Sequence, residues 1–252
     1  MSGVMSVTGY PDGPPVKAGV PVADIGCALF ATYAILSAFI GRLSTGQGQY
    51  IDASLFEAAL AFGIWDISEY WGTGEVPGPL GTANRMSAPY EAVRASDGYF
   101  VIGATNQKLW RLLCIELNRA ELLDDVRFID IAARLANREL LIDELEKTFA
   151  LRTSQEWIDK LLAAGIPAGA LNNYADALGS EHARYRRMRL DIKHPVEGVV
   201  PNIGFPVKLS GTPQQVRRPP PLLGEHTNDV FAEIGVDAET VASFRERGAF
   251  AA

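Results

Sequence analysis

The longest hydrophobic pattern in the chain lies near its N-terminus. Residues 25–40 carry no charged side chain, and small residues alternate there with large apolar ones. This run is too long for a strand, so it predicts a helix that is buried nearly all round. Asp24 precedes the run, where a carboxylate faces the positive end of the helix dipole and free backbone N–H groups. On local sequence Asp24 is either an ordinary N-cap or a carboxylate held at the edge of an apolar core.

The rest of the pattern predicts a mixed α/β chain. Residues 1–22 hold four Gly and four Pro and predict loop and turn. Thr153 and Glu156 have the spacing of a capping box, and Thr227 is placed to cap a late helix. The periodicity breaks at residues 72–81, which we interpret as a hinge. Helices are expected at residues 55–71, 107–118, 122–128, 137–151, 154–164, 227–234 and 238–247, and strands or extended pieces at 50–54, 99–104, 190–193, 199–200 and 206–209.

Composition narrows the class of protein. Hydrophobic residues make up 48% of the 252 residues and charged ones 21%, which is typical of a folded chain. The net charge of −7 argues against nucleic acid or an anionic membrane as main partner. Cys27 and Cys114 lie in apolar helical patterns and fit reduced thiols in a cytoplasmic protein.

Membrane and metal roles are not expected. The apolar run after Asp24 is long enough to raise a transmembrane question, but it is rich in Ala, Gly, Ser and Thr and has no second comparable span. His182 and His194 are isolated and lack metal-ligand spacing, so we expect no metal. The basic run at residues 184–189 could meet the phosphates of CoA, but we favour a solvated helix end as its explanation.

Several short blocks, in a fixed order, resemble one known family. They are Gly13-Pro-Pro, Gly19-Val-Pro-Val-Ala-Asp24, Thr45-Gly-Gln-Gly-Gln49, Ile51-Asp-Ala-Ser-Leu55, Ala88-Pro-Tyr90, Asp97-Gly98, Gly165-Ile-Pro167 and Pro221-Leu-Leu-Gly-Glu-His-Thr227. Each block is weak by itself, but their order and spacing resemble the class III CoA-transferase (CaiB/BaiF) family through nearly all of the chain. The resemblance implies an α/β fold with part of a Rossmann-like large domain and a small α+β domain. It also implies that Asp24 is the catalytic nucleophile.

The resemblance supplies a domain plan. Residues 1–71 are expected to be a large-domain segment, 72–81 a hinge, 82–170 the small domain, and 171–252 a linker and a C-terminal return to the large domain. Nothing in the chain matches the family's N-terminal half, which holds most of the CoA-binding contacts. We therefore expect a homodimer, interlocked as in the family, or a partner that carries the missing half.

The resemblance also points to a substrate-binding loop. In the family a glycine-bearing loop of the small domain folds over the nucleophile and shields the reaction from water. Here Gly78 and Gly81 would allow close backbone approach, although a flexible linker explains them as well. Many relatives carry a His where this chain has Asn84, next to Arg85. Asn can donate hydrogen bonds but cannot act as a base, so this departure from the family bears on substrate preference more than on reaction class.

The expected reaction moves coenzyme A, which enters as an acyl-CoA substrate, to a carboxylic acid. A carboxylate nucleophile such as Asp24 would form an anhydride and then an aspartyl-CoA thioester. Two alternatives remain open. One is an α-methylacyl-CoA racemase, in which the matching Asp works with a His from the N-terminal half. The other is an incomplete subunit that is inactive without a CoA-binding partner.

Overall fold

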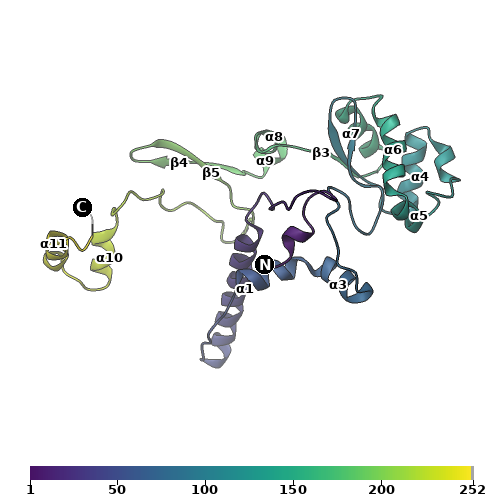
Figure 1. Cartoon of the computed structure of the whole chain (residues 1–252). Coiled ribbons are helices and arrows are strands. Elements are labelled where there is room, and N and C mark those ends of the chain that lie inside the picture. The colour runs from purple at the N-terminus through teal and green to yellow at the C-terminus, as the bar shows by residue number, and fades with distance from the viewer. Residues whose placement is uncertain (251–252) are drawn as a thin grey trace. The chain divides into compact units, whose positions relative to one another are not determined.

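The chain divides into two compact units, Met1–Leu171 and Asn172–Ala252, and the computed structural model describes residues 1–250 of it. Each unit is described by itself. Unit 1 begins with helices and continues into a small antiparallel sheet with helices packed on it. Unit 2 contains short helices and a hairpin (Figure 1). The mixed α/β composition agrees with the sequence expectation.

The first part of unit 1 is helical. After a 3₁₀ turn at Val4–Ser6 come α1 (Val22–Thr45), α2 (Leu55–Phe62) and α3 (Ile64–Thr73). Helix α1 ends at Gly46, whose φ of 74° is the left-handed conformation that glycine adopts without strain. Ser54 caps α2 by accepting a hydrogen bond from the N–H of Glu57. The predicted single helix at 55–71 is therefore two helices, which meet at Gly63.

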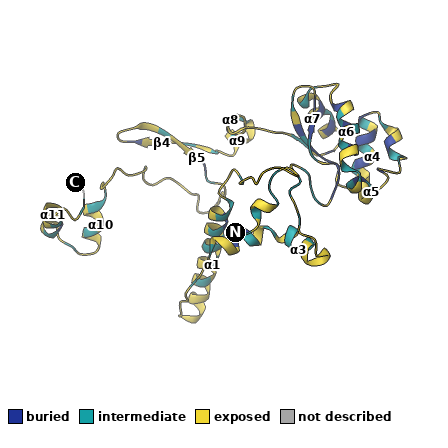
Figure 2. Cartoon of the chain, in the orientation of Figure 1, coloured by how far each residue is buried: buried dark blue, intermediate teal, exposed yellow. Residues whose placement is uncertain are grey.

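The helix α1 is apolar but mostly exposed within this chain. Gly26 is its one buried residue among those described, and Figure 2 shows the helix largely in yellow and teal. Within residues 1–250, α2 is the element that packs most closely on α1. The expectation that α1 is buried nearly all round is thus wrong for the part of the chain that the structure describes. By length and composition alone α1 could also cross a membrane, a test that core helices of folded proteins pass as well.

The hydrophobic core of unit 1 lies between a three-stranded sheet and the helices that follow its first two strands. The sheet has the order β1 (Tyr90–Arg94), β2 (Tyr99–Gly103), β3 (Ala168–Ala170), with antiparallel pairs that place Val93 opposite Phe100 and Phe100 opposite Ala170. The helical elements are α4 (Gln107–Glu116), η2 (Ala120–Leu123), α5 (Ile131–Ala136), α6 (Arg138–Phe149) and α7 (Ser154–Ala163). The fully buried side chains Phe100, Trp110 and Phe149 anchor this core.

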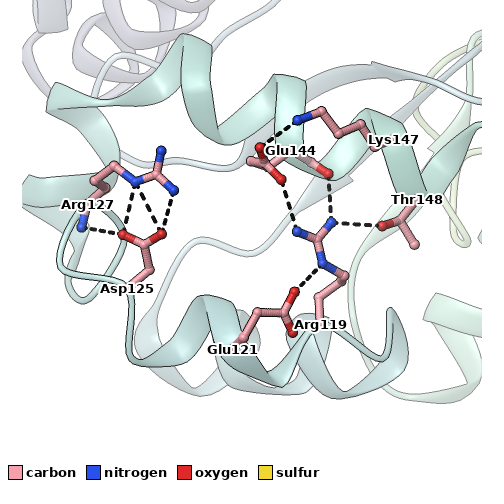
Figure 3. Close-up of polar contacts among 7 residues, drawn as sticks. All are labelled: Arg119, Glu121, Asp125, Arg127, Glu144, Lys147 and Thr148. Carbon is pink, nitrogen blue, oxygen red and sulfur yellow. Dashed lines mark hydrogen bonds and ion pairs between the residues drawn. The ribbon is translucent and has the colours of Figure 1, made fainter.

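Hydrogen bonds and ion pairs between polar side chains connect helical segments at the surface of this core (Figure 3). The guanidinium of Arg119 donates to the Glu144 carboxylate and carbonyl and to the Thr148 hydroxyl, and it pairs with Glu121 beside it in the chain. Hydrogen bonds from Lys147 and Arg119 lower the pKa of Glu144. These bonds connect the segment around η2 to α6, so we interpret the cluster as structural.

Unit 2 carries a hairpin between two pairs of short helices. Its elements are α8 (Tyr174–Gly179), α9 (Glu181–Tyr185), β4 (Arg189–His194), β5 (Gly198–Ile203), α10 (Thr227–Glu233) and α11 (Ala238–Glu246). The ring of His194 organises the hairpin turn: Nδ1 accepts from the N–H groups of Val196 and Glu197, and Nε2 lies 3.1 Å from the Pro220 carbonyl oxygen. Because Nδ1 is the acceptor, the proton lies on Nε2 and is donated to Pro220.

The local predictions have mixed outcomes. The helices at 107–118, 137–151, 154–164, 227–234 and 238–247 and the strands at 99–104, 190–193 and 199–200 are confirmed in position, and the capping box of Thr153 and Glu156 is present. The predicted strand at 206–209 is wrong, since this segment is irregular, and residues 50–54, expected as a strand or an extended piece, form no strand. The predicted helix at 122–128 is replaced by η2, and Thr227 lies inside α10 and does not cap it.

Candidate active site

Asp24 lies in the first turn of α1, as its third residue. The N-cap is Pro21, so the simpler interpretation of Asp24 as the capping residue is wrong. Its side chain is exposed, and within residues 1–250 the carboxylate accepts no hydrogen bond and joins no ion pair. The N-terminus of a helix favours a negative charge through its dipole and free N–H groups. Asp24 is therefore a free carboxylate in a favourable field.

Two residues further along α1, at Gly26, a close contact brings α2 against this end of the helix. A Cβ added to Gly26 would lie 2.3 Å from the Phe62 ring, so glycine is what lets the two helices approach. A groove of about 270 Å³ follows between them, lined by Cys27, Phe30 and Ser54 among others. Cys27 is three residues after Asp24 and so lies on the same side of the helix. The groove thus begins within one turn of the free carboxylate.

The two loop glycines have different environments. Gly81 has φ of 64°, donates its N–H to the Gly9 carbonyl over 2.7 Å, and has its Cα against the Tyr10 ring, which a Cβ would approach to 2.8 Å. Glycine is thus required at position 81 for close packing. A Cβ at Gly78 would meet open space, and it is the carbonyl of Gly78 that makes a contact.

Asn84 organises a turn. Its side-chain oxygen accepts hydrogen bonds from the N–H groups of Met86 at 2.9 Å and Ser87 at 3.2 Å, and its own N–H donates to the Tyr90 carbonyl. This arrangement is an Asx-type turn, which commits the amide oxygen to the backbone. The side-chain NH₂ remains as the group of Asn84 that could donate to a ligand.

Two arginines hold the ends of this turn. Arg138 donates to the Asn84 carbonyl, and the fully buried Arg134 donates to the Ala88 carbonyl over 2.9 Å. Arg134 also donates to the Phe128 carbonyl and to Gln107 Oε1. Burial lowers the pKa of Arg134, which means that desolvation of its charged guanidinium reduces the stability of the fold. Residues 84–88 are consequently a fixed structure, not a flexible linker.

Arg85 points to the other side of the turn, toward α3. Its Nε lies 3.0 Å from Asp66 Oδ1 and 3.2 Å from Glu69 Oε2, and its Nη2 donates to the Gly78 carbonyl over 2.6 Å. A cavity of about 810 Å³ adjoins this cluster. Its lining is mainly apolar with a few polar groups, which is typical of small-molecule sites; it includes Val7, Ile64, Trp65, Ser68, Leu80, Gly81, Ala83, Asn84 and Met86.

The structure brings some predicted site residues together and leaves one apart. Gly81, Asn84 and Arg85 line one cavity, and Gly78 is joined to it through Arg85. Among the described residues, no hydrogen bond or ion pair joins Asp24 to this loop, and Asp24 does not line this cavity. Sequence reasoning missed Asp66 and Glu69, although their spacing of three residues on a helix was the available signal.

Burial shifts the pKa of two further side chains in unit 1. Burial, offset in part by Arg138 and reinforced by Glu146, raises the pKa of Glu91 beside the loop. Burial raises the pKa of Cys114 to about 12, so this thiol is not a nucleophile at neutral pH.

In the basic run of unit 2, Arg184 donates to the Gly179 carbonyl and Arg189 pairs with Asp191. Over residues 1–250 no cluster of metal-ligating side chains is found.

Comparisons with known proteins converge on one family. The model of CoA-transferase family III matches residues 1–227. An acyl-CoA transferase of Fusarium pseudograminearum is 37% identical over 98% of this chain and 55% of its own length. A succinyl-CoA:glutarate CoA-transferase of Mus musculus is 33% identical over 93% of this chain and 54% of its own length. The chain thus spans a little over half the length of these relatives.

Solved structures agree. A CaiB/BaiF family protein from Brucella suis superposes with a TM-score of 0.77 at 34% identity, covering 92% of this chain and 60% of that one. A protein from Mycobacterium tuberculosis superposes with a TM-score of 0.78 at 24% identity, covering 89% of this chain and 60% of that one, and this likeness concerns the fold alone.

Proposed function

The chain belongs to CoA-transferase family III, and on that premise we propose that it passes coenzyme A from an acyl-CoA donor to a carboxylic acid, with Asp24 as nucleophile. The observation that carries the proposal is the free carboxylate of Asp24 in the first turn of α1. Relatives are named for transfer to glutarate, oxalate and mesaconate, which supports a carboxylic acid acceptor.

The proposed chemistry has four steps. The Asp24 carboxylate attacks the acyl carbonyl of the thioester, which forms a mixed anhydride and releases the CoA thiolate. The thiolate attacks the aspartyl carbonyl, so the donor acid leaves and an aspartyl-CoA thioester remains. The acceptor carboxylate then attacks this thioester, giving a second anhydride and free thiolate. Attack of the thiolate on the acceptor's carbonyl yields the new acyl-CoA and restores the Asp24 carboxylate.

The position of Asp24 suits these steps. Each passes through a tetrahedral centre that carries negative charge, and a helix N-terminus offers N–H groups and a dipole that stabilise such charge. A carboxylate nucleophile is needed because the coenzyme must be exchanged between acids of similar energy. The loop that carries Gly78, Gly81, Asn84 and Arg85 is proposed as the substrate-binding segment, which shields the anhydrides from water.

Partners follow from the same proposal. We expect the apolar surface of α1 to be covered in the active enzyme by a second copy of the chain or by polypeptide that carries the family's CoA-binding half. Such a protein would act in the cytoplasm without a metal. Sedimentation of the purified chain with and without CoA tests this expectation.

The nucleophile is tested by substitution and by isotope transfer. Asp24→Asn is expected to abolish transfer in the active assembly while leaving it folded, whereas Asp124→Asn, a matched change of an exposed carboxylate on the same unit, is expected to retain transfer. When the acceptor carboxylate carries ¹⁸O, the bridging oxygen of the second anhydride stays on the enzyme. Mass spectrometry should then find one heavy oxygen on Asp24.

Two results would contradict this assignment. Full activity in Asp24→Asn removes the nucleophile from the mechanism. Exchange of the α-hydrogen of the acyl-CoA for deuterium, without ¹⁸O on Asp24, would favour the racemase alternative.

A further inference from the structure

Two carboxylates on α3 converge on one guanidinium of the substrate-binding loop. Asp66 and Glu69 are three residues apart and so lie on one face of the helix. Both lie within ion-pair distance of Arg85 Nε, at 3.0 and 3.2 Å. Glu69 Oε2 is shielded from solvent and, among the described residues, accepts no well-aligned hydrogen bond, so the charge of Arg85 compensates it.

The same guanidinium closes the loop on itself. Nη2 of Arg85 donates to the carbonyl of Gly78, seven residues earlier, over 2.6 Å. The planar fork of arginine can meet a carboxylate and a carbonyl at the same time, which the single ammonium of lysine does less well. One side chain therefore connects the beginning of the loop, its end and α3.

The following turn is anchored independently. Arg138 and Arg134 hold the carbonyls of Asn84 and Ala88 from the helices α6 and α5. Arg85 is thus the point at which this rigid turn is fastened to α3 as well. A loop fixed from both sides is pre-organised, which lowers the entropic cost of bringing it to a reacting group.

The charges argue against direct binding of a substrate carboxylate by Arg85. One cation faces two anions, so the cluster carries a net negative charge when all three groups are ionised. An acid would have to displace Asp66 or Glu69 to pair with the guanidinium. We propose that Arg85 is a positioning residue, held by Asp66 and Glu69, which fastens the loop of residues 78–85 to α3. The catalytic consequence rests on the proposed function, whereas the fastening itself does not.

The first experiment measures the loop directly by hydrogen–deuterium exchange. The amides of Gly81, Ala83 and Asn84 donate hydrogen bonds inside or next to the loop, so their exchange reports its opening. Asp66→Asn and Arg85→Gln are each expected to speed this exchange about tenfold or more, since bonds to charged groups are lost. The double variant should exchange no faster than Arg85→Gln alone, because both changes break one connection.

Matched controls are available on the same unit. Asp124→Asn and Arg111→Gln remove exposed charges, for which the structure records no ion pair within residues 1–250, and they should leave loop exchange unchanged. Unchanged loop exchange in Asp66→Asn and Arg85→Gln would overturn the proposal. This result needs no turnover, so it is independent of whether the chain transfers CoA.

The second experiment separates positioning from substrate contact in the active assembly. Loss of positioning should lower kcat in both Asp66→Asn and Arg85→Gln, leave KM for the acceptor acid nearly unchanged, and raise hydrolysis relative to transfer. Arg85→Lys should recover part of the loss, because it keeps the ion pair. A rise in KM confined to Arg85→Gln, with normal kinetics in Asp66→Asn, would show that Arg85 contacts the substrate and would overturn the proposal.

Discussion

Arg134 offers a sharp test of how the fold supports the loop. It is fully buried, and its hydrogen-bond acceptors are neutral: the Ala88 and Phe128 carbonyls, both at 2.9 Å, and Gln107 Oε1 at 3.0 Å. Its guanidinium also lies 5.1 Å from the centre of the Trp110 ring. Arg134→Met keeps much of the volume and removes every donor.

The magnitude follows from the groups left behind. Two buried carbonyls without donors cost about 1–3 kcal/mol each, or roughly 2–6 kcal/mol together. Removing the cation returns part of this, because burial disfavours the charged guanidinium, as the direction of its pKa shift indicates. We therefore expect the free energy of unfolding to fall by about 2–4 kcal/mol.

The assay is urea unfolding followed by tryptophan fluorescence, since Trp110 lies beside the altered group. Arg111→Met, on the exposed side of α4, serves as control and should change the free energy of unfolding by less than about 0.5 kcal/mol. An Arg134→Met protein as stable as the control would refute the reasoning, because it would mean that the donors of Arg134 contribute nothing to the fold.

Three further predictions concern single groups. Glu91→Gln should raise the free energy of unfolding at pH 7 and bring no gain well below pH 4.5. The folded pKa of Glu91 lies above the unfolded value, which favours folding at low pH, and this contribution is lost as pH rises through the folded pKa. Equal effects at both pH values would contradict this prediction. Gly26→Ala should destabilise the chain by about 1–3 kcal/mol in thermal unfolding, because its Cβ would meet the Phe62 ring; an unchanged midpoint would mean that the ring moves away freely. Thr153→Ala should lower the free energy of unfolding by about 1 kcal/mol, because it removes the hydroxyl group of the capping box. The backbone N–H and the hydroxyl of Thr153 both donate to Glu156 and lower its pKa, and the variant loses the second bond, so part of the loss should disappear as pH falls through that folded pKa; a loss independent of pH would contradict this account.

Local signals predicted local structure well. The apolar run after Asp24 is a helix, and the spacing of Thr153 and Glu156 gives a capping box. Asn173 and Asp176 have the same spacing and also form a capping box, which begins the helix α8, an element absent from the sequence expectations. Short-range hydrogen bonds leave a trace in sequence because both partners lie within one turn.

Long-range contacts were beyond the sequence. The ion pair of Arg85 with Asp66 joins residues on different segments, and the local sequence around either residue does not indicate the other as its partner. Arg134 was unexpected as a core residue, since charged side chains are rarely buried without a paired charge. The exposure of α1 was also unexpected. An apolar pattern indicates that burial of the helix is favourable, but it does not identify the element that covers the helix.

The sheet of unit 1 has a consequence for synthesis on the ribosome. Strand β2 is central, and its second neighbour, β3, is made only after α4, α5, α6 and α7. One edge of the β1–β2 hairpin therefore stays unpaired while these helices emerge, and exposed strand edges invite pairing with other chains. A nascent chain stalled before residue 168 should consequently depend on chaperones, and that dependence should end once β3 has been translated.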